Sequence, residues 1–290
     1  MDKSKRLPRV AAIHDLSCLG KCSLTMALPV ISATGVECSC IPTAVLSTHT
    51  GEFRGYTLRE LSEDMTTIAR HWKSEGLEFD AIYSGYLASP EQGALLEEID
   101  SILNRPGILH VVDPVMADHG EYYAAFDDSM RDTFRRLCAS ADIITPNITE
   151  AALLAGLPYR EPPHDMQYIS DLLAGLFDLG AKTVALTGFQ PRLDIVAVAA
   201  LEHDKSSEPS IVFQPARPGV FYGTGDLFAS ALTALILRGA ALEDAVELAV
   251  GFISESIENT INRGTPRREG VDFESAMPKY IHSVAELFGE

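Results

Sequence analysis

The sequence predicts an α/β fold with a mostly parallel sheet and an antiparallel edge near the carboxyl end of the chain. Short apolar runs alternate with amphipathic stretches along the whole sequence, which is the pattern of consecutive β-α-β units. Two late β-runs, residues 195–201 and 210–213, are joined by a polar turn over residues 202–209, and this favours an antiparallel hairpin. Neither a repeat of fixed period nor a long flexible linker divides the 290 residues. We therefore expect a single domain over residues 1–290, with residues 1–9 as a flexible N-terminal tail.

The predicted strands and helices alternate in chain order, and glycines mark several helix ends. Gly35, Gly76 and Gly156 follow three predicted helices at the position where a left-handed residue commonly ends a helix. The predicted strands cover residues 10–13, 36–41, 81–84, 109–115, 142–145, 183–187, 195–201 and 210–213. The predicted helices cover residues 22–34, 58–75, 92–103, 129–139, 147–154, 165–179, 226–237 and 242–260. In such folds ligands bind at the carboxyl ends of the strands, so polar residues that follow strands are the first candidates for function.

The composition describes a globular chain that repels polyanions. With 46% hydrophobic and 22% charged residues, the chain can bury a large core, which excludes disorder and a coiled coil. The 23 Lys and Arg residues against 41 Asp and Glu residues give a net charge of −18, and the densest basic stretch is the terminal one at residues 3–9. Because such a charge repels a phosphate backbone, we expect no nucleic acid partner.

Apolar runs and cysteines indicate the compartment. The apolar stretch after the basic N-terminus, residues 10–13, stops at His14, so we expect no export. The longest apolar run, residues 227–237, is too short to span a bilayer, so we expect no membrane insertion. The five cysteines are an odd number, and they lack the paired spacing of a disulfide framework or a zinc site: Cys18, Cys22, Cys38, Cys40 and Cys138. We therefore expect free thiols and a cytoplasmic protein.

A glycine-rich turn, Gly223-Thr224-Gly225-Asp226, lies between a β-run and a long apolar helix. Glycines let the backbone approach an anion closely, and the amides at a helix start point toward a phosphate. At that helix start we expect a lowered pKa for Asp226, which would accept a proton from an alcohol held in line with a γ-phosphate. The pattern indicates phosphoryl transfer, although the same tetrapeptide also occurs as an ordinary helix N-cap.

Acidic residues lie at the ends of two neighbouring predicted strands. Asp113 and Asp118 follow one strand, and Asn147 and Glu150 begin the helix that follows the next. Carboxylates at adjacent strand ends suit Mg²⁺, which takes oxygen ligands. Asn147 and Glu150 also have the spacing of a capping box, and Asp113 precedes a proline, so structural and functional roles are both open.

A third group of polar residues follows strands in the first third of the chain. Asp15 lies after the first strand, His49 and Thr50 after a short β-run, and Tyr86 after the strand at residues 81–84. These side chains could line a substrate pocket, where Tyr86 could stack on an aromatic ring. They could equally be loop residues whose polar atoms have partners within the protein.

Six short motifs occur along the chain: I-H-D-L-S from residue 13, S-T-H-T-G from 47, S-G-Y-L from 84, D-P-V-M-A-D from 113, T-P-N-I-T-E from 145 and G-T-G-D from 223. Their combination and order resemble the pyridoxal/pyridoxamine (vitamin B6) kinase branch of the ribokinase-like superfamily. The resemblance covers residues 10–262. It implies a ribokinase-like three-layer α/β/α fold around a mostly parallel central sheet.

The resemblance also implies an activity, its cofactors and its residues. The activity is ATP-dependent phosphorylation of the 5′-hydroxymethyl group of pyridoxal, pyridoxamine or pyridoxine by a homodimer, with Mg²⁺ and room for a monovalent cation. Asp226 matches the general base, and Gly223, Thr224 and Gly225 match the anion hole. The resemblance assigns nucleotide binding to Asp113, Asn147, Thr187 and Thr224, metal binding to Asp113, Asp118 and Glu150, and vitamer binding to Asp15, His49, Thr50 and Tyr86.

One residue departs from the resemblance, and two alternatives remain open. Asp15 stands where many of these kinases carry a serine, which makes the pocket more anionic and favours a protonated ring nitrogen or an amine. The nearest alternative is a hydroxymethylpyrimidine kinase of the same superfamily, but residues 16–20 lack its run of glycines. A non-catalytic vitamer sensor on the same fold is the other alternative. Residues 116–123 are the candidate lid.

Overall fold

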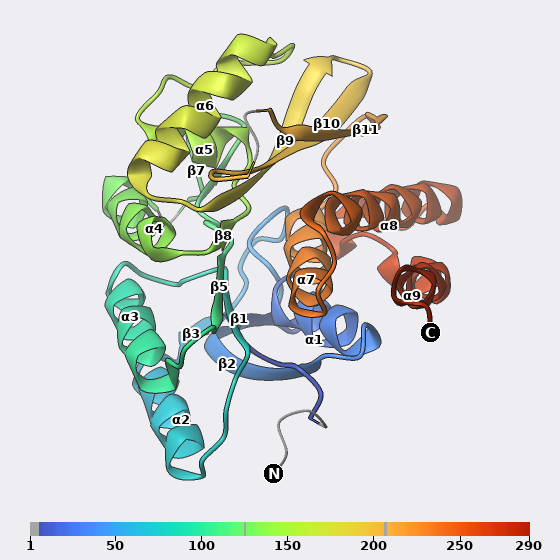
Figure 1. Ribbon diagram of the computed structural model, residues 1–290. Coiled ribbons are helices and arrows are strands. Elements are labelled where there is room, and N and C mark those ends of the chain that lie inside the picture. Colours follow the sequence, from blue (N-terminus) through green and yellow to red (C-terminus); the bar gives the residue numbers. More distant parts are fainter. Residues whose placement is uncertain (1–5, 125, 206–207) are drawn as a thin grey trace.

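A computed structural model describes residues 6–124, 126–205 and 208–290. Its centre is a nine-stranded sheet (Figure 1) with the order β11 (Ser210–Pro215), β10 (Ile195–Glu202), β9 (Thr183–Arg192), β8 (Ile143–Ile144), β5 (Leu109–Val112), β4 (Ala81–Ser84), β1 (Arg9–Ser17), β2 (Glu37–Leu46) and β3 (Leu58–Glu60). The strands from β9 to β2 pair in parallel. β10 and β11 continue the sheet as the predicted antiparallel hairpin, and β3 adds a second antiparallel edge that the sequence did not predict.

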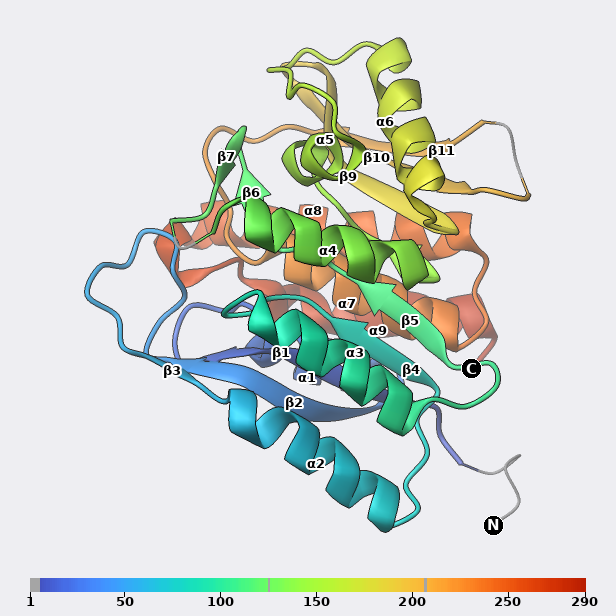
Figure 2. The same cartoon turned by 90° about the vertical axis from the view of Figure 1, so that its left-hand side faces the viewer.

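Helices cover both faces of this sheet and complete the three-layer α/β/α fold that the sequence predicts (Figures 1 and 2). One face carries α2 (Ser62–Ser74), α3 (Glu91–Leu103), α4 (Asp128–Ser140), α5 (Ile148–Ala155) and α6 (Met166–Leu179), and the other carries α1 (Leu24–Ala33), α7 (Thr224–Leu237), α8 (Leu242–Arg263) and α9 (Phe273–Phe288). In β1, Ala11 and Ile13 pack on the first face, and Val10 and Ala12 pack on the second. Because side chains alternate along a strand, a strand buried on both faces is continuously apolar.

Helix α7 is apolar on nearly all sides because protein surrounds it. All residues from Leu227 to Leu235 are buried, and the helix packs against α1 and α8 as well as the sheet. A helix without a polar face belongs to a core. In the described part of the chain, no helix has the length and apolar character needed to cross a membrane.

Local pairing corrects several predicted boundaries. The helix predicted over residues 58–75 begins only at Ser62, because residues 58–60 form β3 and pair with β2 through contacts such as Arg59 opposite Val45. Arg9 belongs to β1 and not to the predicted tail, and Arg6 forms an ion pair with Asp80 at 2.7 Å. Residues 1–5 of that tail and of the basic stretch, and residues 206–207 of the predicted turn, lie outside the described residues.

Besides β3, helix α9 and a short hairpin were not predicted. Helix α9 contains Pro278, whose missing N–H interrupts a helical pattern, yet its buried face packs against α8 through Phe252 and Tyr280, whose ring centroids are 4.2 Å apart. The second element is a short hairpin of β6 (Ala117–Asp118) and β7 (Glu121–Tyr122) within the candidate lid.

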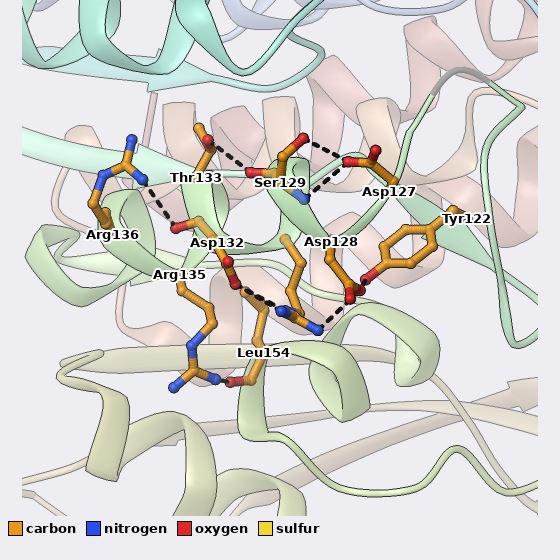
Figure 3. A network of polar contacts seen from close by, with 10 residues as sticks. Tyr122, Asp127, Asp128, Ser129, Asp132, Thr133, Arg135, Arg136 and Leu154 are labelled. Carbon is orange, nitrogen blue, oxygen red and sulfur yellow. Dashed lines mark hydrogen bonds and ion pairs between the residues drawn. The ribbon is translucent and has the colours of Figure 1, made fainter.

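The hairpin is fastened to the start of α4 (Figure 3). The Tyr122 hydroxyl donates a hydrogen bond to Asp128 at 2.8 Å, and Arg131 holds Asp128 from the next turn of the helix at 2.9 Å. Asp127 caps α4 by accepting from the Ser129 N–H at 2.9 Å. Arg135 of α4 also donates to the Leu154 carbonyl in α5. The hairpin therefore has a fixed base beside the carboxyl ends of β5 and β8.

Candidate active site

The polar residues predicted for function gather at the carboxyl edge of the parallel strands and at the start of α7. Asp15 lies in β1, His49 follows β2, Tyr86 follows β4, Asp113 follows β5 and Asn147 follows β8. The charge of Asp226, in the first turn of α7, raises the pKa of Asp113, and the charge of Asp15 raises the pKa of Asp226. These three carboxyl groups therefore share one electrostatic environment, although 211 positions separate Asp15 from Asp226 in the sequence.

The start of α7 has the geometry of an anion site. Gly223 caps the helix in the left-handed conformation with φ 83°, and a Cβ there would lie 2.3 Å from the Lys21 carbonyl oxygen. Only glycine fits that position. A Cβ on Gly225 would meet no atom within 4 Å, so the backbone there faces open space. Helix N-terminal amides that face open space carry partial positive charge and can bind a phosphate.

Asp226 differs from its sequence prediction. Its pKa is not lowered but raised to about 7, because burial penalises the charged form and the Asp15 charge adds repulsion, while a hydrogen bond from the Ser23 backbone N–H acts in the opposite direction. The helix-start argument failed because the fold buries this carboxyl group and also places a second carboxylate nearby. A carboxyl group with a pKa near neutral is well matched to accept a proton from an alcohol.

Asn147 and Glu150 form the predicted capping box at the start of α5. The Glu150 N–H donates to Asn147 Oδ1, and the Asn147 N–H donates to Glu150 Oε2, both at 2.9 Å. Glu150 Oε1 also accepts from the Met116 N–H at 3.2 Å, and Asn147 Nδ2 donates to the Ala117 carbonyl at 2.8 Å. Both residues therefore hold the segment that leads into the β6–β7 hairpin.

Asp113 and Glu150 are buried carboxyl groups, with 5% and 3% of their surfaces exposed. Burial and the Asp226 charge raise the pKa of Asp113 to about 8, and burial and the Asp113 charge raise the pKa of Glu150 well above its usual value. Asp118 also repels Glu150, but its side chain is 44% exposed on the hairpin and it accepts from the His119 N–H at 2.8 Å. Bringing a cation to this edge would relieve the mutual repulsion.

The described residues contain no group of three or more His, Cys, Asp or Glu side chains placed to hold a metal ion by themselves. Asp113, Asp118 and Glu150 are thus near one another without forming a closed ligand set. This agrees with the chemistry of Mg²⁺, which keeps waters and is commonly bound by one or two carboxylates together with substrate phosphates. The donors present fit a magnesium ion of that open kind.

Thr187 lies beside the capping box. It forms a parallel bridge with Asn147, and its N–H donates to the Pro146 carbonyl at 2.9 Å. Its hydroxyl lies 3.4 Å from the same carbonyl oxygen. The hydroxyl of Thr224, across the edge in α7, donates to the Phe221 carbonyl at 3.1 Å. Asn147, Thr187 and Thr224 therefore come from three different elements at the carboxyl edge of the sheet.

His49 is held by backbone groups on both sides of its ring. Nδ1 accepts from the Gly51 N–H at 3.0 Å, so the proton is on Nε2, which donates to the Arg268 carbonyl at 2.6 Å. Burial lowers the pKa of His49, which keeps the ring neutral. The predicted vitamer residue therefore has no free ring nitrogen, and it joins the loop after β2 to a segment near the carboxyl end of the chain. Thr50, next to it, is exposed.

Tyr86 is half-buried after β4, with its ring centroid 5.6 Å from that of Phe126. Burial and the charge of Asp15 raise the pKa of its hydroxyl above the usual value. Tyr86 and Asp15 therefore face the same part of the edge.

Sequence reasoning missed the segment that lines this edge between β1 and α1. Lys21 and Ser23 have positive φ angles of 42° and 52°, and Gly20 has a φ of 110°. Ser23 hydrogen-bonds to Asp226 through its N–H and to Asp15 through its hydroxyl. No sequence signal marks positive φ at lysine or serine, since these residues rarely adopt it. The role of Ser23 is evident only from the folded chain.

Comparisons with known proteins show that the chain is similar to kinases. A family model described as phosphomethylpyrimidine kinase matches residues 26–270. A Bacteroides thetaiotaomicron protein assigned to the phosphomethylpyrimidine kinases, crystallised with pyridoxal, is 34% identical, with 95% of this chain and 96% of that one covered and a TM-score of 0.90. The pyridoxal kinase of Lactobacillus plantarum is 30% identical, with 97% and 99% covered and a TM-score of 0.87. The Bacillus subtilis hydroxymethylpyrimidine/phosphomethylpyrimidine kinase is 28% identical over 215 residues, which cover 72% of this chain and 73% of that protein.

Proposed function

Because the chain belongs to the phosphomethylpyrimidine kinase family, we propose that it transfers the γ-phosphoryl group of ATP to the 5′-hydroxymethyl group of a vitamin B6 vitamer. The observation that carries this proposal is the position of Asp226, a proton acceptor with a pKa near neutral, in the first turn of α7, beside Gly225, whose backbone faces open space. The likeness to a protein crystallised with pyridoxal and to a pyridoxal kinase supports the choice of acceptor.

In the proposed reaction, Asp226 accepts the proton of the acceptor hydroxyl as its oxygen attacks the γ-phosphorus. The bond between that phosphorus and the oxygen bridging to the β-phosphate breaks, and ADP leaves with the electron pair. The amides of Gly223, Thr224 and Gly225 donate to the phosphoryl oxygens, where negative charge is held in the transition state. Asn147 and Thr187 are the proposed nucleotide contacts on the opposite side of the edge.

Mg²⁺ fits the donor set of Asp113, Glu150 and Asp118, as their mutual repulsion indicates. When bound, the ion neutralises charge on the nucleotide phosphates. Glu150 has a second role, since it accepts hydrogen bonds from the Asn147 and Met116 amides and thus holds the base of the hairpin. The motif resemblance further supports a cytoplasmic protein and a homodimer, and sedimentation of the purified protein would test the dimer.

The test is ADP release from Mg-ATP with pyridoxal, pyridoxamine, pyridoxine and hydroxymethylpyrimidine as separate acceptors. We expect turnover on B6 vitamers and a loss of about 10²–10⁴-fold in Asp226→Asn. Asp204→Asn is the matched control, because it removes the same charge from a side chain that is 97% exposed. Vitamer binding without turnover in the wild-type protein would contradict the kinase assignment and favour a sensor.

A second candidate is phosphorylation of hydroxymethylpyrimidine, which the family description and the Bacillus subtilis relative favour. Both acceptors offer a hydroxymethyl group on an aromatic heterocycle to the same base. Turnover on the pyrimidine alone would replace the B6 proposal by this one.

A further inference from the structure

The short segment between β1 and α1 has a backbone conformation that its side chains disfavour. Three non-glycine residues have a positive φ in the described part of the chain, and two of them, Lys21 with 42° and Ser23 with 52°, lie in this segment. Residues other than glycine adopt this conformation at a cost in free energy, and it persists only where the surrounding structure holds it. The segment therefore depends on contacts that fix it from outside.

The conformation of this segment places a donor at the proposed base. The Ser23 N–H donates a hydrogen bond to Asp226, and the Ser23 hydroxyl hydrogen-bonds to Asp15. The Lys21 carbonyl oxygen lies 2.3 Å from the position that a Cβ on Gly223 would take, so it packs against the first residue of the glycine-rich turn. A displacement of this segment would therefore reach both the base and the turn that binds the phosphoryl group.

An ion-pair network anchors the Lys21 side chain to the end of α8 and the start of α9. Its ammonium group lies 3.5 Å from Asp272 Oδ1 and 2.8 Å from Glu274 Oε2. Asp272 is only 7% exposed, and Arg263 Nε lies 3.2 Å from its other carboxylate oxygen. Because Asp272 is shielded from water, salt and solvent screen its attraction to Lys21 less than they screen an exposed ion pair.

The backbone around Asp272 is itself held on two sides. Its N–H donates to the Thr260 hydroxyl at 2.8 Å, and that hydroxyl donates to the Ser256 carbonyl within α8 at 2.7 Å. The N–H of the preceding residue, Val271, donates to the Tyr222 carbonyl at 3.2 Å. The carboxylate of Asp272 therefore has a fixed position relative to α8 and to the residue that precedes the glycine-rich turn.

We propose that Lys21 and Asp272 are positioning residues, whose ion pair holds the segment between β1 and α1 in the conformation that directs the Ser23 N–H at the base. This inference rests on the proposed function, in which Asp226 is the base, and adds two residues that act on it through Ser23. A small displacement of a catalytic group lowers the rate strongly, even where the cause lies outside the reacting atoms.

Lys21→Met removes the ammonium group and keeps a long side chain on the same backbone. Arg263 remains as a partner of Asp272, so the buried carboxylate keeps an opposite charge. We expect kcat with pyridoxine to fall about tenfold and the KM for ATP to change by less than about twofold. The midpoint of the pH profile of kcat/KM should move to higher pH, because the hydrogen bond from Ser23 favours the charged form of the base.

Lys21→Gly separates the backbone from the charge. Glycine adopts a positive φ without a side chain to hold it there. If the ion pair acts through the backbone, Lys21→Gly keeps kcat within about threefold of the wild type and keeps the pH midpoint, although it loses the same charge as Lys21→Met. An equal loss of kcat and an equal shift of the midpoint in both variants would mean that the ammonium group acts on the reaction by its charge, which would overturn the inference.

A double-mutant cycle tests the pair itself. Asp272→Asn should lower kcat as Lys21→Met does, and the double variant should be no slower than the slower single variant, since both substitutions remove one ion pair. Lys279→Met is the matched control, because Lys279 also joins α9 to α8, through Glu255 at 2.7 Å, but its side chain is 72% exposed. We expect this control to leave kcat, KM and the pH midpoint unchanged.

Two further results would overturn the inference while the proposed function stands. The first is a Lys21→Met variant with the kcat and the pH midpoint of the wild type. The second is a double variant in which the losses caused by Lys21→Met and Asp272→Asn multiply, as they do for independent sites. If the wild-type protein phosphorylates no acceptor, the proposed function fails, and this inference fails with it.

Discussion

Asn147 and Glu150 cap the same helical turn reciprocally, each accepting the N–H of the other at 2.9 Å. Because Glu150 is also a buried carboxylate repelled by Asp113, one side chain has a structural and an electrostatic role that can be separated by substitution. Glutamine can take the place of glutamate in a capping box but carries no charge.

We expect Glu150→Gln to keep the cap through its one amide oxygen, to lose the second acceptor that Glu150 offers to the Met116 N–H, and to need a higher Mg²⁺ concentration for half-maximal rate. Glu150→Ala should show the same loss of Mg²⁺ affinity and, in addition, a stability lower by about 1–2 kcal/mol, because it also loses the cap. Chemical denaturation and initial rates against Mg²⁺ at fixed ATP measure the two effects. An unchanged Mg²⁺ dependence in Glu150→Gln would restrict this residue to capping.

Gly20→Ala should weaken the hydrogen bonds by which the His49 ring joins the loop after β2 to the Arg268 carbonyl. The added Cβ would lie 2.2 Å from His49 Cδ2, and the residue has a φ of 110°, so both contact and backbone oppose it. Gly35→Ala is the matched control, since Gly35 also has a positive φ, 80°, but nothing within 4 Å of its Cβ position. We expect Gly35→Ala to cost about 1 kcal/mol, and Gly20→Ala to cost more and to raise KM for the acceptor. Equal denaturation curves and equal KM values for the two variants would show that the contacts of His49 do not hold the loop after β2.

Much of the fold follows from local signals, and the exceptions have physical reasons. The strand Ala81–Ser84 and the αL cap at Gly156 agree with the sequence because short apolar runs and glycine stops are local. Residues 58–60 read as helix because their exposed side chains give no period, and only pairing with β2 makes them a strand. A local sequence pattern therefore predicts most helices and strands, but a strand at the edge of a sheet is recognised only when the strand that it pairs with is known.

The sequence predicted which residues belong to the site, but it did not predict their pKa shifts or their hydrogen-bond partners. Motifs at strand ends indicated Asp113, Asn147 and Asp226, because parallel strands bring their carboxyl ends to one edge. The raised pKa of Asp226 depends on its burial and on the charge of Asp15, and the partner of His49 Nε2 is a carbonyl 219 residues away. Such contacts depend on the tertiary fold, so spacing in the sequence does not reveal them.

The pair His110 and Asp100 should make stability depend on pH. His110 Nδ1 lies 3.5 Å from Asp100 Oδ2, and this carboxylate raises the pKa of His110 above 6.5. The histidine therefore binds its proton more tightly when folded. Its contribution to stability is complete below the unfolded pKa and is lost as the pH rises through the folded pKa.

Asp100→Asn tests this linkage. The difference in unfolding free energy between wild type and variant should be largest near about pH 6 and shrink toward about pH 9. Urea denaturation at several pH values measures it, with His110→Gln as the partner of a double-mutant cycle. A difference that stays constant with pH would show that the carboxylate of Asp100 stabilises the fold without His110.

The pH dependence of the rate should report the coupling between Asp226 and Asp15. The pKa of Asp226 is raised to about 7 by burial and by the charge of Asp15, and only the deprotonated form accepts a proton from the acceptor. Wild-type kcat/KM should therefore fall as the pH drops through this value. Asp15→Asn removes one cause of the raised pKa, so the midpoint should move to lower pH even though the absolute rate decreases. Asp204→Asn should leave the midpoint of the pH profile unchanged, because the Asp204 side chain is 97% exposed and solvent and salt screen its charge. Profiles measured with pyridoxine for all three proteins cancel the ionisation of the acceptor itself, and a midpoint unmoved by Asp15→Asn would show that burial alone sets the pKa of the base.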